Sequence, residues 1–256
     1  MRILYLGDIV GEKTISVLKK HIEEIKRENH IHIVLCNAEN VTKGRGLSFI
    51  HYKQLKGLGI AGMTMGNHTF SKSEIKEFID DATIARPANL TTDLGKDVLY
   101  IQYNQETIAL INLLGRVYLN IPLDCPFKTL ESMLPNITAD KIIVDFHGEA
   151  TSEKRAFFYN FAGKVDAIIG SHTHIKTDDA EVYKNTCYIT DMGMCGPKYS
   201  VLGSEVDGIL ERFKTGIYEP AKVSEDATIQ LNGVILDLGK ENKIEDFKKI
   251  IKAPIL

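Results

Sequence analysis

Short apolar runs alternate with amphipathic stretches along most of the chain. Over Glu12–Asn29, isoleucine and leucine recur every three or four residues, which predicts an amphipathic helix between two strands: Ile15, Leu18, Ile22 and Ile25. Ser71 and Glu74 form a capping box that predicts a helix through Ile79. The segment Thr151-Ser152-Glu153 predicts a further helix start.

Two pairs of β-like runs are separated by short turns and predict hairpins. Val98–Tyr103 pairs with Thr107–Leu113, and Ala180–Tyr183 pairs with Thr186–Thr190. Alternation over Ala227–Leu238 predicts another strand, followed by a charged end that we expect to be helical. This order predicts an α/β fold with two packed sheets and outer helices, as a single domain over residues 1–256.

Five of the apolar runs lead into polar side chains that can bind a metal ion. The runs and the groups that follow them are Ile3–Leu6 before Asp8, Ile31–Leu35 before Glu39 and Asn40, Ile60–Met65 before Asn67 and His68, Ile142–Phe146 before His147, and Val165–Ile169 before His172 and His174. Because parallel strands present ligands beyond their carboxyl ends, we expect these side chains to meet at one edge.

The residue types in this set suit a centre with two cations. Glu39 can bridge two ions through its two oxygens, while imidazole nitrogens and amide oxygens complete the coordination. Two cations about 3.5–4 Å apart bind a water between them, lower its pKa and clamp an in-line phosphoryl displacement. The nucleophile is then a bridging hydroxide, so the reaction requires no Ser or Cys.

His68 has a separate expected role, because adjacent Asn67 and His68 cannot easily point at one cation from a tight turn. We expect His68 to donate a proton to the departing oxygen or to stabilise phosphoryl charge.

These blocks resemble those of the calcineurin-like metallophosphoesterases, and closer variants resemble the bacterial YmdB-like branch. The superfamily blocks are Gly7-Asp8, Gly66-Asn67-His68, His147 and Gly170-Ser171-His172-Thr173-His174; the YmdB-like variants are Ala38-Glu39-Asn40, Met65-Gly66-Asn67-His68-Thr69, Arg86-Pro87-Ala88-Asn89 and the run from Asp145 to Lys154. The resemblance implies a four-layer α-β-β-α sandwich, a centre of two divalent or mixed-valence ions with iron or manganese favoured, and 2′,3′-cyclic-nucleotide phosphodiesterase activity.

The chain departs from the wider superfamily at three positions. Val10 stands where a histidine is usual, Glu39 where aspartate is usual, and Thr69 where an acidic residue is common. The resemblance implies that Asn40 replaces the missing imidazole. One metal would then take Asp8, Glu39, Asn40 and His174, and the other Glu39, Asn67, His147 and His172.

Composition narrows the partners and the compartment. The net charge of −3 leaves no footprint for stable duplex nucleic acid. Cys36, Cys125, Cys187 and Cys195 show no C-x-x-C spacing and are expected to be reduced. Without a signal peptide or a membrane-length apolar run, we expect a cytoplasmic protein that acts on a small nucleotide. The resemblance also allows for homo-oligomers.

Other conspicuous residues receive a structural interpretation or stay open. His21, His30, His32 and His51 lack a partner motif and are assigned no catalytic role. Gly44-Arg45-Gly46 is read as a turn at the rim of the site. Arg86 and Arg116 could bind a substrate phosphate or form structural ion pairs.

Two functional alternatives stand beside the phosphodiesterase. A 5′-nucleotidase or other phosphomonoesterase would use the same metal chemistry on a dianionic ester. A regulatory protein would use the metal centre as a ligand sensor, with hydrolysis incidental.

Overall fold

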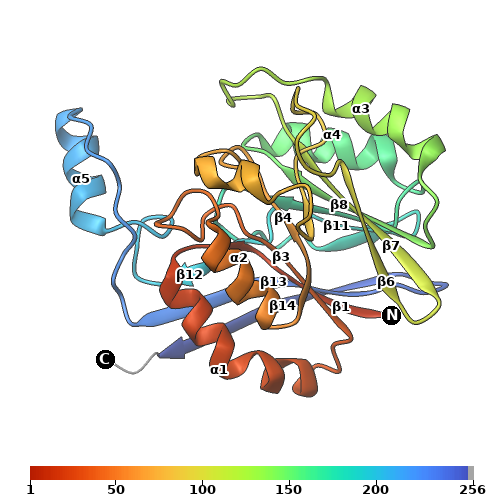
Figure 1. The fold of residues 1–256 in the computed structure, drawn as a ribbon, viewed down its shortest axis with the longest axis horizontal. Coiled ribbons are helices and arrows are strands. Elements are labelled where there is room, and N and C mark those ends of the chain that lie inside the picture. Colours follow the sequence, from red (N-terminus) through yellow and green to blue (C-terminus); the bar gives the residue numbers. More distant parts are fainter. Residues whose placement is uncertain (253–256) are drawn as a thin grey trace.

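The computed structural model describes residues 1–252 and contains two mixed β-sheets (Figure 1). The first sheet has the order β2-β12-β13-β1-β3-β4-β5, with β14 beside β13. Its strands are β1 (Arg2–Leu6), β2 (Asp8–Ile9), β3 (Ile33–Asn37), β4 (Ile60–Thr64), β5 (Ile84–Ala85), β12 (Met194–Pro197), β13 (Thr228–Asp237) and β14 (Lys243–Lys252). Strands β1, β3, β4 and β5 run parallel, whereas β13 is antiparallel to β1.

The second sheet has the order β10-β11-β9-β8-β7-β6. Its strands are β6 (Val98–Tyr103), β7 (Glu106–Leu114), β8 (Lys141–His147), β9 (Ala167–Ser171), β10 (Glu181–Tyr183) and β11 (Thr186–Ile189). The central strands β7, β8 and β9 are parallel, and antiparallel hairpins form both edges. Both hairpins predicted from the sequence are therefore confirmed.

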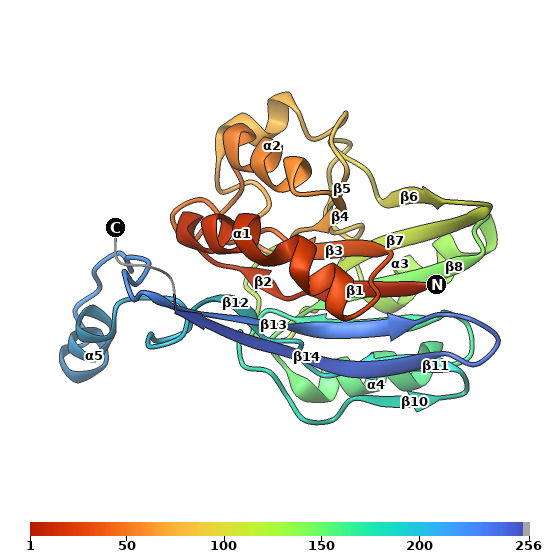
Figure 2. The same cartoon turned by 90° about the horizontal axis from the view of Figure 1, so that it is seen from below.

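Helices cover the outer face of each sheet (Figure 2). The first sheet is covered by α1 (Glu12–Glu28) and α2 (Phe49–Gly57), and the second by α3 (Pro126–Met133) and α4 (Thr151–Phe161). Short 3₁₀ helices lie at Ser73–Glu77 (η1) and Leu134–Asn136 (η2), and α5 (Val206–Thr215) stands apart from both sheets. The predicted helix at 12–29 and the helix start at Thr151 are confirmed.

The apolar runs are continuous because their strands are buried on both faces. In β1, Ile3 and Tyr5 join the core between the sheets, whereas Leu4 and Leu6 join the core under α1. Alternate side chains of a strand point to opposite faces, so a strand in a central layer is apolar throughout. With a third core between the second sheet and its helices, this gives the expected four-layer α-β-β-α sandwich.

Two expected helices are wrong. Ser71 donates its backbone N–H to the His68 carbonyl, which closes a turn, and only the short η1 follows. The charged C-terminal segment is strand β14, paired with β13 along its whole length. Its many charged residues occupy an exposed edge strand, where they discourage pairing with other chains.

The packing between the two sheets predicts how the free energy of unfolding changes in a core variant and in a surface variant. Leu110 on β7 is fully buried between the sheets, so Leu110→Ala should lower the free energy of unfolding by about 2–5 kcal/mol. Leu210 on α5 is 44% exposed, and Leu210→Ala should change it by less than about 0.5 kcal/mol. Urea denaturation measures both; an equal loss in the two variants would contradict this packing.

No helix among the described residues is both long and apolar enough to cross a membrane.

Candidate metal centre

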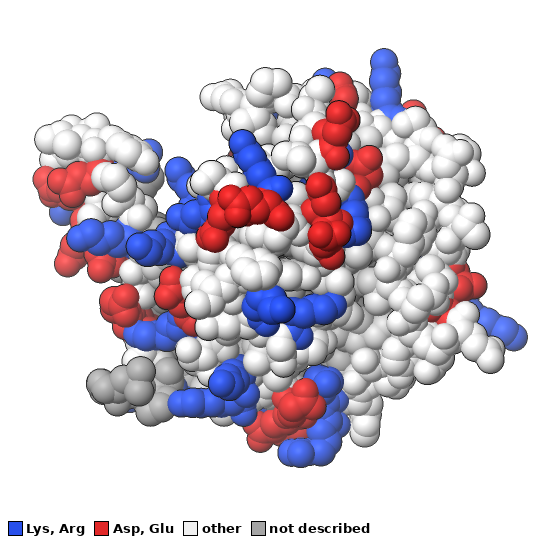
Figure 3. All heavy atoms as spheres, viewed as in Figure 1, with Lys and Arg blue, Asp and Glu red and all other residues white. Residues whose placement is uncertain are grey.

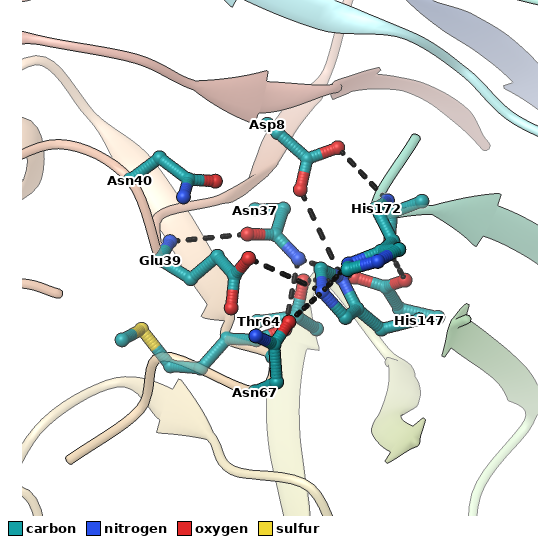
Figure 4. A network of polar contacts seen from close by, with 12 residues as sticks. Asp8, Asn37, Glu39, Asn40, Thr64, Asn67, His147 and His172 are labelled. Carbon is teal, nitrogen blue, oxygen red and sulfur yellow. Dashed lines mark hydrogen bonds and ion pairs between the residues drawn. The ribbon is translucent and has the colours of Figure 1, made fainter. Parts of the chain in front are cut away.

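The polar side chains expected at the strand ends lie close together, and they come from both sheets. Asp8 begins β2, Glu39 and Asn40 follow β3, Asn67 follows β4, and His147 ends β8. Figure 4 shows Glu39, Asn67, Asp8 and His172 directed toward the His147 ring. The sandwich therefore brings two sets of strand ends to one place.

His147 is the centre of the most compact group. Its Nε2 lies 3.2 Å from Glu39 Oε1, 3.0 Å from Asn67 Oδ1 and 3.0 Å from His172 Nδ1. The ligand atoms of Glu39, His147 and His172 lie within 4.8 Å of one another. One carboxylate, one amide oxygen and two imidazoles converging in this way form a donor set suited to a transition-metal ion.

A second, looser group lies beside the first. His174 Nε2 is 3.3 Å from Asn40 Oδ1, and its Nδ1 is 2.9 Å from the Leu202 carbonyl oxygen. Asn40 is held by a backbone bridge to Val10, the position at which the motif resemblance leads one to expect a histidine. The structure therefore brings Asn40 next to His174 without an imidazole at position 10.

Asp8 has the environment of a metal ligand. Its side chain is fully buried, and Oδ2 accepts a hydrogen bond from the His172 backbone N–H at 3.3 Å. Its Oδ1 has no hydrogen-bond partner among the described residues and lies 3.8 Å from His147 Nδ1. A buried unpaired carboxylate oxygen is costly, and a cation would satisfy it. The donors present fit a metal ion.

The pKa values in this group reflect opposing effects of burial and charge. Burial raises the pKa of Asp8 to about 7, although His174 and His147 oppose the rise. Burial also favours neutral Glu39, but the charge and hydrogen bond of His147 outweigh it and lower the pKa of Glu39 to about 2.

The pKa values of the two imidazoles in the compact group shift in opposite directions. Burial disfavours the charged form of both, yet Glu39 raises the pKa of His147 to about 9. For His172, burial and the neighbouring charge of His147 lower the pKa to about 3. His172 is therefore neutral near pH 7 and able to offer a lone pair, whereas His147 would have to release a proton to bind a metal ion.

A buried hydrogen-bond network fixes the orientation of the His147 ring. Ser171 Oγ lies 2.9 Å from His147 Nδ1 and donates to Asp145 Oδ1 at 2.5 Å. Asp145 also accepts from Asn37 Nδ2 at 3.1 Å and from the Thr64 hydroxyl. Such outer partners leave the opposite ring nitrogen, Nε2, directed at Glu39, Asn67 and His172.

The loop carrying His172 and His174 is held in an unfavourable conformation. Both histidines have positive φ, at 101° and 64°, which is rare for residues with a side chain. Asp191 accepts bonds from Thr173 N at 2.9 Å and from the buried Lys154 Nζ at 2.9 Å. These bonds stabilise a loop shape that directs both imidazoles into the site.

His68 lies beside the compact group and is partly exposed. Its backbone N–H donates to Glu39 Oε2 at 2.9 Å. The ring makes only long contacts, of which the shortest is 3.4 Å to Asn67 Nδ2. Burial, supported by the charge of Arg45, lowers the pKa of His68. Thr69 is bonded to the Gly66 carbonyl at 2.6 Å through its hydroxyl, so it does not orient this ring.

Several other residues now receive definite positions. Arg86 is buried, donates to the carbonyl oxygens of Leu94, Pro87 and Thr92, and pairs with Asp97, so its role is structural. All four cysteines are free. His51 bonds to Thr42 and Ser48, which steadies the loop containing Gly44 and Arg45.

The compact group, Asp8, and the second group with Asn40 and His174 together form the candidate metal-binding group. A cavity of about 510 Å³ opens over it. Glu39, Asn40, His68, His172 and His174 lie in its wall, and Gly44 and Arg45 lie at the same cavity, as expected for a turn beside the site. Sequence reasoning missed several further lining residues, among them Lys72, Leu202, Arg212 and Tyr218. None of these four belongs to a motif or directly follows a strand of the sandwich, so no local signal singled them out.

A family model described as YmdB-like protein matches residues 4–250. The chain belongs to the YmdB-like family. Among its relatives, the Bacillus subtilis protein named 2′,3′-cyclic-nucleotide 2′-phosphodiesterase is 39% identical over 248 residues, covering 95% of this chain and 93% of that protein. The resemblance inferred from the motifs is confirmed.

Two solved structures have the same fold. A Mycoplasma pneumoniae protein described as a novel phosphatase superimposes with a TM-score of 0.93 at 37% identity, covering 99% of this chain and 95% of that one. A hypothetical protein from Thermus thermophilus gives a TM-score of 0.92 at 30% identity, covering 99% and 100%. The similarity to these two structures therefore extends over 99% of the chain.

The lack of space beside Gly66 predicts that a larger residue there causes loss of metal. A Cβ at Gly66 would lie 2.3 Å from Glu39 Oε2 and 2.4 Å from His147 Nε2. We expect Gly66→Ala to displace both side chains and to lose most of the bound Mn²⁺, measured by elemental analysis after dialysis. Gly57→Ala is the control, because nothing lies within 4 Å of a Cβ there. Full metal content in Gly66→Ala would contradict the role of this contact.

Proposed function

We propose that this chain is a metal-dependent phosphodiesterase that hydrolyses 2′,3′-cyclic nucleotides. The observation that carries the proposal is the convergence of Glu39, Asn67 and His172 on His147, next to the unpaired Asp8 oxygen. The name of the Bacillus subtilis relative supports the choice of a cyclic nucleotide.

The ligands are assigned to two positions that share Glu39. Asp8, Asn40 and His174 would complete one, and Asn67, His147 and His172 the other. Iron or manganese fits this mixture of oxygen and nitrogen donors. When bound, the two ions supply an activated water and polarise the phosphoryl oxygens.

The reaction adds one water to the cyclic diester. A P–O bond forms to the water oxygen, the P–O2′ bond breaks, and a proton passes to O2′, which leaves a 3′-phosphate. His68 is the proposed proton donor, through a ring N–H, because its ring lies in the cavity wall and makes no short bond with another residue. The bond from its backbone N–H to Glu39 holds it at the edge of the metal-binding group.

The proposal is tested first by the substrate. The Mn²⁺-loaded protein is expected to hydrolyse 2′,3′-cyclic AMP much faster than 5′-AMP. Faster turnover of 5′-AMP would establish the phosphomonoesterase instead. Tight binding of the cyclic nucleotide without turnover would favour a ligand sensor.

The role of His68 predicts a loss of rate without a loss of metal. We expect His68→Ala to lower kcat for 2′,3′-cyclic AMP by about 10²–10⁴-fold, because proton donation is removed. Metal content should stay near that of the wild type. His21→Ala, which removes a histidine on α1, is the matched control and should leave both quantities unchanged. Loss of metal from His68→Ala would make His68 a ligand rather than a proton donor.

The two metal positions should differ in affinity. The position with His174 has one imidazole beside two carboxylates and one amide, whereas the other has two imidazoles beside one carboxylate and one amide, and metal affinity depends on the types of ligand present. Titration of metal-free protein with Mn²⁺ by calorimetry should resolve a tight and a weak site. Two equally tight sites would be inconsistent with the assignment.

A further inference from the structure

The cavity carries more positive charge than a cyclic mononucleotide requires. Its wall includes the basic side chains Lys43, Arg45, Lys72 and Arg212. Within residues 1–252, none of these four forms an ion pair. The acidic residues of the wall, Glu39 and Glu149, each bond to a histidine of the site. A 2′,3′-cyclic mononucleotide brings only one negative charge to this surface.

Three of these cations lie on two separate elements that line the same cavity. Lys43 and Arg45 occupy the loop after β3, which is tied to the site by the bond from Asn40 Nδ2 to the Gly44 carbonyl at 3.1 Å. Arg212 belongs to α5. Figure 3 shows Lys and Arg side chains, with Asp and Glu side chains beside them, where α5 meets the body of the molecule.

The segment bearing α5, residues 205–222, forms an arm whose base lies beside the metal-binding group. Its base is closed by backbone bonds from Glu205 N to Lys222 O and from Ser224 N to Gly203 O, both 2.9 Å. Immediately before the arm, the Leu202 carbonyl contacts the ring of His174. The arm is therefore directly connected to a residue of the site, although α5 itself packs against neither sheet.

The arm presents an aromatic ring and a cation together. The Arg212 guanidinium lies over the Tyr218 ring, 4.6 Å from its centroid, and both line the cavity. Tyr218 is 61% exposed. An exposed aromatic side chain beside unpaired cations is the arrangement that holds single-stranded nucleic acid, with the base stacked and the backbone phosphate paired.

We propose that the substrate is a short single-stranded oligoribonucleotide that ends in a 2′,3′-cyclic phosphate. This rests on the proposed function: the terminal cyclic phosphate lies at the metal-binding group, and the preceding nucleotide lies along Lys43, Lys72 and the arm. Tyr218 stacks on its base, and Arg212 binds its phosphate. The chemistry at the terminal phosphate is unchanged, with water added and the P–O2′ bond broken.

The length of the nucleotide substrate tests the proposal. We expect kcat/KM of the Mn²⁺-loaded enzyme to be about 10-fold or more higher for ApApA 2′,3′-cyclic phosphate than for 2′,3′-cyclic AMP, because stacking and phosphate contacts are added. A log–log plot of kcat/KM against salt should steepen by about 0.7 for each added phosphate contact. Equal kcat/KM values with equal salt slopes would overturn the proposal.

Variants of the arm locate the effect. Arg212→Gln and Tyr218→Ala should each lower the ratio of the two kcat/KM values severalfold, and both should fold, because α5 has no buried residue and Tyr218 is 61% exposed. Arg27→Gln, at an exposed arginine on α1, is the control and should keep the wild-type ratio. A length preference that survives in both arm variants would also overturn the proposal.

A binding measurement separates this inference from the proposed function. If the wild type hydrolysed no cyclic phosphate, the proposed function would be wrong. Anisotropy of fluorescent ApApA 3′-phosphate would still report on the arm: weaker binding by Arg212→Gln than by Arg27→Gln would support its contact with an oligonucleotide, and equal binding would refute it.

Discussion

Two buried carboxylates, Asp8 and Glu39, lie where strands of both sheets end, and the site is organised around their negative charge. The charge of Glu39 is partly compensated by His147, whereas one oxygen of Asp8 has no hydrogen-bond partner among the described residues. Burying unpaired charge is expensive, so this arrangement favours the arrival of cations. The same charge raises the pKa of His147, which couples metal binding to the loss of a proton.

The surrounding structure keeps these groups from relaxing. Ser171, which donates to Asp145, orients the His147 ring through its Nδ1 atom. Asp191, paired with Lys154, stabilises the loop in which His172 has a positive φ. These supports come from the second sheet, from helix α4 that covers it, or from the segment after β11, whereas Asp8 and Glu39 belong to the first sheet or follow one of its strands. The packing of one sheet on the other is thus what assembles the donor set, since neither sheet holds it alone.

Much of the site could be predicted from the sequence because its residues follow apolar runs. A strand buried on both faces is easy to detect, and the polar residue after it is placed at the sheet edge by topology alone. The lining residues Arg212 and Tyr218 could not be found in this way, because they belong to an arm outside the core periodicity. Strand β14 was misread for a related reason: its charged residues resemble a helix surface until β13 supplies a pairing partner.

The central claim is that Glu39 is shared between two metal ions at this site. A crystal structure of the Mn²⁺-loaded protein, with anomalous difference maps collected near the manganese edge, tests it most directly. The account predicts two anomalous peaks about 3.5–4 Å apart, with a Glu39 oxygen bound to each. A single peak, or two peaks that do not both contact Glu39, would contradict it.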